Sequence, residues 1–454
     1  REVVVPNRRR ATFQLGEERM VIVAREGVTE LLDLVTLLSA FVVEARKLEK
    51  LLGGGDLLAD IRAYIAAPPQ LGEENRLLVR LAFDLGTTDD HMMALREAWG
   101  DQTLERLLCL VDHPPHLRVR LHRDYCLQSA LNRSRLWAER LAHEISQRAP
   151  GRPLHIISSN THSTVNLLSP FARHYQAEIL TWGEQVRPEL FHSDEVCAAN
   201  RVYVLLRSWL EAHPERAREQ QELLAECGIS VLSDHERVGV TAQFLDMACI
   251  PLEFVDPRLH LQGFESGQAP VIVNFDYAFG DQAGVVGEQL FRELRDCQVR
   301  SFSIMGKAGS LVGPRGSIML PNYLIREGTR DVYDIPNGNL LQASDFEDLE
   351  VYADGPMLTV LGTILQNDQL LHSYRVDWKA LGLEMEGVPY IRAVHQALKL
   401  GWLPKDLRVA IGYYASDSPL IPGESLARSL SLQGVDATYG LNIALLRKLF
   451  HQRG

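Results

Sequence analysis

The stretch "APVIVNFDYAFGDQAGVVGEQLFRELRDCQVRSFSIM" (269–305) decides the fold. An apolar run over 269–278 is followed by a helical pattern over 281–297 and by a second apolar run over 299–305. Two strands joined by a helix of this length run parallel in one sheet, because the crossover returns the chain to the edge where the first strand began. The stretch therefore predicts a mainly parallel sheet with helices packed on its faces.

The same alternation extends in both directions from this stretch. Further strands and helices are expected on the C-terminal side: extended chain over 316–325, strands over 355–362, 381–386 and 407–417, and helices over 388–401 and 438–450. Upstream, 152–175 reads as strand, polar turn and helix start, and 226–234 as a helix-to-strand transition. Before residue 150 the periodicity is helical, most clearly over 29–52.

These patterns predict an α/β protein in three parts. We expect a mainly helical N-terminal domain (1–150), an α/β region of unassigned role (151–264) and a C-terminal domain (265–454) with a mainly parallel mixed sheet flanked by helices. A chain of 454 residues is long enough for two or three domains.

Composition excludes several classes of protein. The formal net charge of -12 argues against a nucleic-acid binder, which would carry a basic excess. Without an apolar span of 18 uncharged residues, no membrane helix is predicted. The six cysteines are scattered and form no C-x-x-C pair, which is typical of free thiols in a reducing compartment, so we expect a cytoplasmic protein. His113, His116 and His122 lack the spacing of metal ligands, so neither a metal nor a cofactor is expected.

Polar motifs stand where three apolar strands end: "GKAGSL" (306–311), "EMEG" (384–387) and "ASD" (415–417). Ligands of open parallel sheets gather outside the carboxyl ends of the strands, so these motifs can line one crevice. Each motif also has a purely structural interpretation, as a glycine-rich turn, a solvated helix start and a helix cap respectively. Their common position at strand ends favours a site that includes Glu386 and Asp417.

Four motifs in this order resemble the nucleoside phosphorylase and nucleosidase superfamily: "GKAGSL", "RGSIMLPNYLIREGT" (315–329), "LEMEG" (383–387) and "YYASDSPL" (413–420). The tail "SDSPLIPGE" (416–424) is similar to that of the AMP nucleosidase branch. The resemblance covers roughly 265–454. It implies cleavage of the N-glycosidic bond of a purine nucleoside or nucleotide in a symmetric homo-oligomer, with no nucleic-acid or membrane partner.

The resemblance also implies roles for individual residues. Asp417 would protonate the departing base with Ser416 orienting it, since desolvation disfavours the charged form of a buried aspartate. Glu386 would accept hydrogen bonds from the ribose hydroxyls and place negative charge near the cationic sugar, while Met385 packs against the ring.

Other positions receive less defined roles from the resemblance. Lys307, Ala308 and Gly309 would line the base or anion side of the site, where glycine allows close backbone approach. Glu384 is a second candidate acid, because residues i and i+2 of a strand point to the same side.

One departure from the family pattern concerns the nucleophile. Phosphorylases of this superfamily carry Gly-Asp-Pro-x-Arg after the first strand, whereas "FGDQAGVVGE" (279–288) has Gly280 and Asp281 but no arginine. Phosphate would lose a bidentate partner, so water is favoured as nucleophile. Phosphate with Lys307 or Arg326 as its partner stays open.

Three further questions stay open at this point. The general base could be Asp276, Asp281 or Glu288, and a 5′-phosphate on the substrate is neither required nor excluded. The alternative function is a non-catalytic nucleoside or nucleotide sensor derived from the same fold. A nicotinamide-dependent oxidoreductase is disfavoured, because no G-x-G-x-x-G follows a strand with an acid about 20 residues later.

Overall fold

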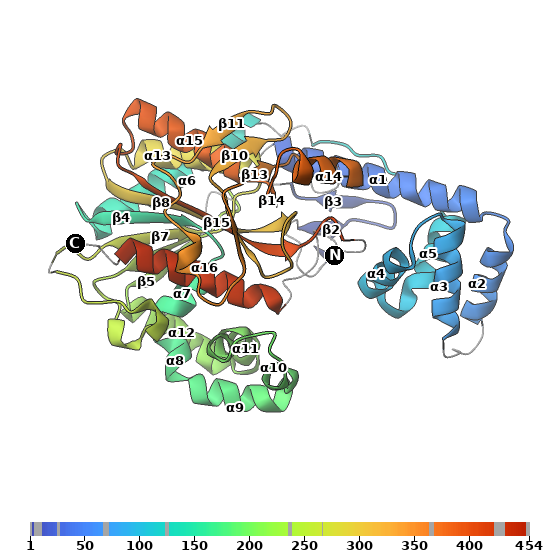
Figure 1. The fold of residues 1–454 in the computed structure, drawn as a ribbon, viewed down its shortest axis with the longest axis horizontal. Coiled ribbons are helices and arrows are strands. Elements are labelled where there is room, and N and C mark those ends of the chain that lie inside the picture. Colours follow the sequence, from blue (N-terminus) through green and yellow to red (C-terminus); the bar gives the residue numbers. More distant parts are fainter. Residues whose placement is uncertain are drawn as a thin grey trace.

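The structure is a computed structural model that describes residues 2–3, 11–24, 28–66, 72–122, 127–234, 238–265, 267–362, 367–421 and 432–450. Its centre is one mixed sheet with helices on both faces, so the predicted α/β class is confirmed (Figure 1). The strands of this sheet are β4 (Pro153–Ser158), β5 (Ile229–Leu232), β6 (Ala242–Asp246), β7 (Val271–Phe275), β8 (Gln298–Ser310), β9 (Ile318–Leu320), β10 (Tyr323–Arg326), β11 (Val332–Asp334), β12 (Val351–Ala353), β13 (Pro356–Thr359), β14 (Gly382–Glu384) and β15 (Arg408–Asp417).

The strand order is β11-β10-β13-β14-β8-β4-β7-β6-β5, and β15 pairs with β8 and β9 while β12 pairs with β9. The long strand β8 lies parallel to β4 along its first half and to β15 along nearly all its length. β14 lies antiparallel to the end of β8 and parallel to β13. All five residues of β7, Val-Ile-Val-Asn-Phe, are buried, as expected of a strand covered on both faces.

Two layers of helices cover the sheet. On one face pack α6 (Leu127–Arg148), α13 (Asp281–Glu293) and α15 (Gly387–Leu400), and on the other α7 (Ser163–Leu168) and α16 (Gln433–Phe450). The periphery carries α14 (Asp368–Val376), η2 (Leu252–Phe254), η3 (Pro257–Leu259) and η4 (Ala343–Asp345). α15 ends at Gly401, whose φ of 73° suits the left-handed cap that glycine adopts readily.

A helical insertion follows α7 and has its own apolar core (Figure 1). It consists of α8 (Phe171–His174), α9 (Gln176–Val186), α10 (Glu189–His192), α11 (Ala198–Ala212) and α12 (Pro214–Glu226). Tyr203 of α11 donates to the buried carboxylate of Asp256 at 2.8 Å, and its ring stacks on Tyr439 of α16 with centroids 4.6 Å apart. Arg258 pairs with Asp256 at 2.7 Å, so a buried ionic cluster fixes the insertion to the sheet domain.

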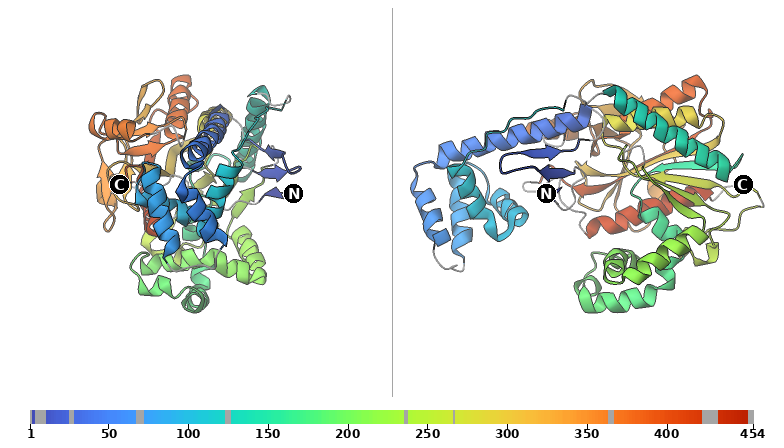
Figure 2. Two further views of the ribbon diagram at one scale, coloured as in Figure 1. Left: turned by 90° about the vertical axis from the view of Figure 1, so that its right-hand side faces the viewer. Right: turned by 180° about the vertical axis from the view of Figure 1, so that it is seen from behind.

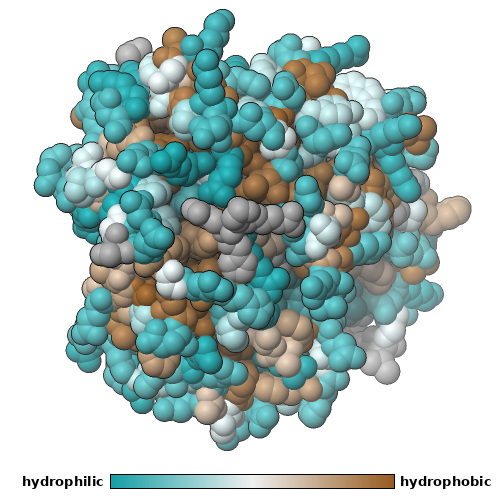
Figure 3. Space-filling model, turned by 60° about the vertical axis from the view of Figure 1, so that its left-hand side comes forward, coloured by the Kyte–Doolittle hydropathy of each residue, from teal (hydrophilic) through white to brown (hydrophobic). Residues whose placement is uncertain are grey.

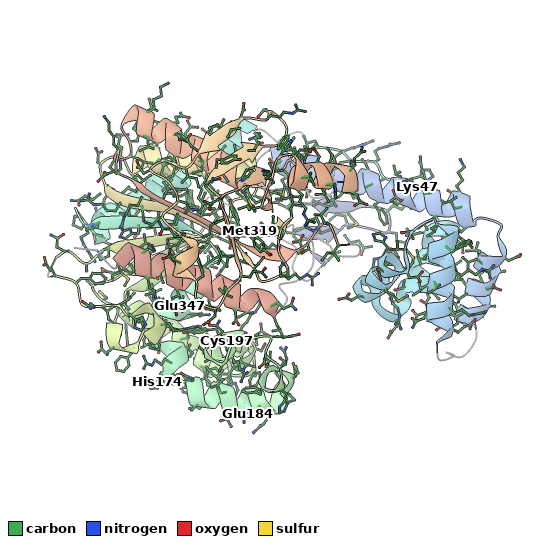
Figure 4. All side chains as sticks on the ribbon, viewed as in Figure 1. Lys47, His174, Glu184, Cys197, Met319 and Glu347 are labelled. Carbon is green, nitrogen blue, oxygen red and sulfur yellow. The ribbon has the colours of Figure 1, made fainter. Side chains whose placement is uncertain are left out.

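The N-terminal part combines a small sheet with a helical bundle. The strands are β1 (Glu2–Val3), β2 (Thr12–Gln14) and β3 (Met20–Ile22), and the helices are α1 (Val28–Leu52), α2 (Asp56–Ala66), α3 (Glu73–Asp84), α4 (Asp89–Trp99), η1 (Gly100–Gln102) and α5 (Thr103–Asp112). Figure 2 shows the small sheet beneath α1, which runs from the main sheet to the bundle. Lys47, labelled in Figure 4, lies on the half of α1 next to the bundle. The bundle has a core separate from those of the main sheet.

Two sequence-based expectations need correction. The "GKAGSL" segment was expected as a turn, but β8 continues to Ser310, because 301–309 pair with β15 and Gly309 and Ser310 pair with β14. Hydrogen-bond partners on both sides thus hold glycine-containing backbone in a strand. In addition, β4, β5 and β6 belong to the same sheet as the later strands, so the expected boundary at 264/265 falls inside one sheet.

Surface and thiol features of the described part are ordinary. Hydrophilic residues cover most of the face in Figure 3, with small apolar areas between them. The cysteines at 109, 197, 227, 249 and 297 are free thiols. Among the described helices, none combines the length and apolar character needed to cross a membrane.

Candidate active site

The carboxyl ends of β4 and β14 face each other along one edge of β8. Ser158, the last residue of β4, pairs with Ile304 of β8, while Leu383 of β14 pairs with Gly309. Because β4 runs parallel to β8 and β14 antiparallel to it, the two strands approach each other and leave residues 305–308 of β8 between their ends. This interval is where a ligand could reach strand-end groups from both sides.

The opposite edge of β8 is occupied by β15. Tyr413 pairs with Gly306, and Asp417 pairs with Gly309 after an irregularity in the register. Asp417 and Leu383 therefore flank the same residue of β8. The strands that lead into the "EMEG" and "ASD" motifs, 31 positions apart in sequence, therefore end on opposite edges of one strand, and a pocket shared by the two motifs stays a prediction.

A buried tyrosine hydroxyl marks the centre of this arrangement. Tyr390 of α15 receives a hydrogen bond from the hydroxyl of Ser158 (3.2 Å) and lies against the backbone N–H of Ala278, which follows β7. Burial raises the pKa of Tyr390, and the nearby charges of Glu386 and Asp276 raise it further. The Tyr390 hydroxyl thus contacts Ser158 at the end of β4 and Ala278 after β7, and the charge of Glu386, just beyond β14, acts on it.

Glu384 is buried beneath the start of α15 rather than facing the interval with Glu386. Its Oε2 accepts the backbone N–H groups of Glu386 (2.6 Å) and Gly387 (2.5 Å), and its Oε1 accepts the hydroxyl of Thr359. Burial, reinforced by the charge of Glu386, raises the pKa of Glu384 to about 7. The carboxyl group therefore caps a helix, and α15 begins where it does because this cap is present.

Gly387 is required at this point because two polar groups lie against it. A side-chain carbon at 387 would be 2.8 Å from Glu384 Oε1 and 2.8 Å from the hydroxyl oxygen of Tyr413. Burial, and then the charges of Glu384 and Glu386, raise the pKa of Tyr413 well above its ordinary value. The Tyr413 ring also fits against Gly306, which leaves room for it.

The remaining sequence-predicted residues occupy different environments. Asp417 is buried, and its Oδ1 accepts the Ser416 hydroxyl at 2.6 Å, while the same hydroxyl lies 3.3 Å from the carbonyl oxygen of Ala308. Glu386 is half-buried at the N-cap of α15, and Met385 is buried. On β8, Ala308 and Gly309 are buried but Lys307 is exposed. Met319, labelled in Figure 4, lies in the sheet and leaves no space for a side chain at position 382.

The three candidate general bases are separated by the fold. Asp276 lies near Tyr390, as described above. Asp281 is engaged twice, by Arg326 (Nη2 to Oδ1, 2.9 Å) and by the hydroxyl of Thr29 (3.1 Å). Glu288 contacts Gln396 between α13 and α15 at 3.4 Å, away from the strand ends. Of the three candidates, Asp276 lies nearest the strand ends described above, where its charge contributes to the raised pKa of Tyr390.

Sequence reasoning missed the groups that support these side chains. Tyr390 follows Glu386 by four positions on the same helix, and this i, i+4 spacing could have indicated it. Thr359 and Thr29 carried no signal, because their partners are far away in sequence. Within the described ranges, no group of three or more His, Cys, Asp or Glu side chains is arranged to hold a metal ion.

Comparison with known proteins gives a family. The model of a family of unknown function, DUF6909, matches residues 1–451. No curated protein matches the sequence. The structure is similar to a 5′-methylthioadenosine/S-adenosyl homocysteine nucleosidase from Campylobacter jejuni, with 10% identity and a TM-score of 0.38 over 66% of this chain and 99% of that one.

Two further solved structures are similar at the same level. AMP nucleosidase from Bacteroides thetaiotaomicron is 14% identical, with a TM-score of 0.33 over 67% of this chain and 96% of that one. Purine nucleoside phosphorylase from Toxoplasma gondii, solved with immucillin-H, is 14% identical, with a TM-score of 0.33 over 52% of this chain and 87% of that one. At these identities the similarity concerns the fold alone.

Proposed function

We propose that this chain, which belongs to the DUF6909 family, hydrolyses the N-glycosidic bond of a purine nucleoside or nucleotide. The observation that carries the proposal is that Asp417, and Leu383 three residues before Glu386, pair with Gly309 from the two edges of β8. This arrangement can hold a sugar on one carboxylate and a base on the other. The order of the motifs along the chain gives independent support.

In the proposed reaction, water attacks the anomeric carbon while the bond to the base breaks and its electron pair moves onto the base. Asp417 donates a proton to a ring nitrogen of the base, and Asp276 takes the proton from water. Glu386 accepts the ribose hydroxyls, and its negative charge stabilises the oxocarbenium-like sugar. Met385 packs against the sugar, and Ser416 orients Asp417 through the 2.6 Å hydrogen bond.

Water is preferred to phosphate because the cations near the site are limited. No arginine follows Gly280 and Asp281, and Arg326 already pairs with Asp281. Lys307 is exposed on β8 and belongs to the base side of the proposed site together with Ala308 and Gly309. Phosphate would therefore have to share the Arg326 guanidinium with Asp281, which already binds its Nη2.

The test is base release from purified full-length protein incubated with purine nucleosides and their 5′-phosphates, each with and without inorganic phosphate. We expect free base without added phosphate and no acceleration when phosphate is supplied. Release only with phosphate would change the reaction to phosphorolysis. Binding of a nucleoside or nucleotide without any release of base would replace the proposal by the non-catalytic sensor. The proposal also includes a symmetric homo-oligomer and a cytoplasmic location.

A further inference from the structure

The first turn of α1 contacts the loop that follows β7, although the two segments are 252 positions apart in sequence. The hydroxyl of Thr29 donates to Oδ2 of Asp281 at 3.1 Å and accepts the backbone N–H of Asp281 at 3.0 Å. Thr29 is buried with 5% of its surface exposed, while 31% of the Asp281 side chain is exposed, so the two hydrogen bonds are partly shielded from water. Loss of the Thr29 hydroxyl would therefore leave the backbone N–H of Asp281 with a poorer partner.

The shape of the loop matches this contact. Gly280 has a φ of 58°, and a side-chain carbon there would lie 2.4 Å from Cγ2 of Thr29. The threonine methyl thus occupies the space that any other residue at 280 would need. The contact is therefore sterically specific: it requires glycine at 280 as long as threonine occupies position 29.

Asp281 connects Thr29 to the sheet through a second bond of its carboxylate. Its second carboxylate oxygen binds Nη2 of Arg326 at 2.9 Å, at the carboxyl end of β10. Arg326 pairs in the sheet with Thr359, whose hydroxyl binds Glu384. A continuous set of contacts therefore leads from α1 to the cap of α15, where Glu386 begins the helix.

The other end of α1 belongs to a different unit. α1 spans 25 residues, about 37 Å, and its last turns pack in the core of the bundle formed with α2 to α5. Figure 1 shows this bundle standing away from the sheet, connected to it by α1 and by the returning segment 113–122. The first turn of α1 is therefore one route by which movement of the bundle would reach the site.

We propose that Thr29 is a positioning residue of the active site, which acts through Asp281 on the 276–281 loop and on Arg326. This inference rests on the proposed hydrolytic function for its kinetic consequence, but the mechanical link can be measured without substrate. The N-terminal bundle is thereby coupled to the segment that carries Asp276. A ligand that moved the bundle would change proton transfer at Asp276 rather than the chemistry at Asp417.

The experiment compares Thr29→Val, which removes the hydroxyl and keeps the shape, with Thr29→Ser, which keeps the hydroxyl. Thr36→Val is the matched control, because the Thr36 hydroxyl bonds only to the carbonyl groups of Leu32 and Asp33 within α1. Amide hydrogen exchange at 279–284 is measured in the full chain without ligand. We expect at least tenfold faster exchange in Thr29→Val and values near wild type in Thr29→Ser and Thr36→Val.

Kinetics of base release then separate positioning from mere stability. We expect Thr29→Val to lower kcat about tenfold with KM within a factor of three, because the segment it loosens carries the proposed general base Asp276, and Thr29→Ser to restore most of the loss. Unchanged exchange in Thr29→Val, or changed exchange with unchanged kcat, overturns the inference. A different outcome is that Thr29→Val changes the exchange while the wild type releases no base from any substrate. That result keeps the mechanical link and removes the proposed hydrolysis instead.

Discussion

Replacement of Glu384 by glutamine tests the electrostatics at the base of the site. Glutamine has the same shape as glutamic acid, and its amide can face the Thr359 hydroxyl while its oxygen accepts the two backbone N–H groups of α15. The variant therefore resembles the neutral form of Glu384 at every pH. Only the wild type gains a buried charge as the pH rises.

The magnitude follows from the pKa of Glu384. Burial raises it from 4.5 to about 7, so the folded protein binds more protons than the unfolded chain between these values. The stabilisation that this group provides is complete below pH 4.5 and is lost as the pH rises through 7. A rise of this size corresponds to about 3 kcal/mol, at 1.36 kcal/mol for each pH unit.

The assay is equilibrium urea unfolding of wild type and Glu384→Gln from pH 5 to pH 8. We expect the free energy of unfolding of the wild type, relative to the variant, to fall by about 2.5 kcal/mol across this range, because part of the loss already occurs below pH 5. Titrating groups that do not interact with Glu384 cancel in the difference. Glu211→Gln serves as control, because Glu211 is exposed and paired only with Arg207 across one helical turn. Parallel curves for wild type and Glu384→Gln would refute the buried, proton-binding carboxyl group.

Three other substitutions test the site and the frame around it. Asp417→Asn should lower base release by about 10²–10⁴-fold with an unchanged circular dichroism spectrum, since the amide cannot donate the same proton; unchanged turnover would remove Asp417 from the mechanism. Glu386→Gln should weaken ribosides far more than the free base in calorimetric titration, and equal losses would contradict a sugar contact. Asp256→Ala should lower the free energy of unfolding by about 3 kcal/mol, because it leaves Arg258 without its buried partner; a loss below 1 kcal/mol in urea unfolding would show that the cluster does not hold the insertion.

The elements of the sheet domain were accessible from the sequence because their patterns are local. Each strand that was expected on either side of 269–305 is present, and the helix expected over 388–401 is α15. The strand-end rule placed Glu386 and Asp417 just beyond or at the ends of β14 and β15, and both strands do end beside β8, β14 antiparallel and β15 parallel to it, while their shared pocket stays a prediction. Neither inference required knowledge of contacts between distant segments.

The errors have a common physical cause. Lys307, Ala308 and Gly309 were expected in a turn, because glycine and lysine have low strand propensity, but pairing with β15 and β14 outweighs propensity. Glu384 was expected to face the same side as Glu386, but the strand ends at residue 384 and Glu386 has helical dihedral angles. Both cases depend on neighbours that are 70 or more positions away, or on where a helix begins, and local patterns contain neither.

The position of β4 explains why the chain cannot be divided where its composition changes. β4 lies between β8 and β7, so it supplies the middle of the sheet although it precedes β7 by more than 100 residues. Ser158 at its end bonds Tyr390, which lies beside Glu386 and Asp276. Without β4, the facing edges of β7 and β8 would lose their hydrogen-bond partners, and the interval between strand ends would lose one of its two sides. The candidate site is therefore a property of residues from about 150 onward taken together, and α1 adds the contact at Asp281 that joins the N-terminal bundle to it.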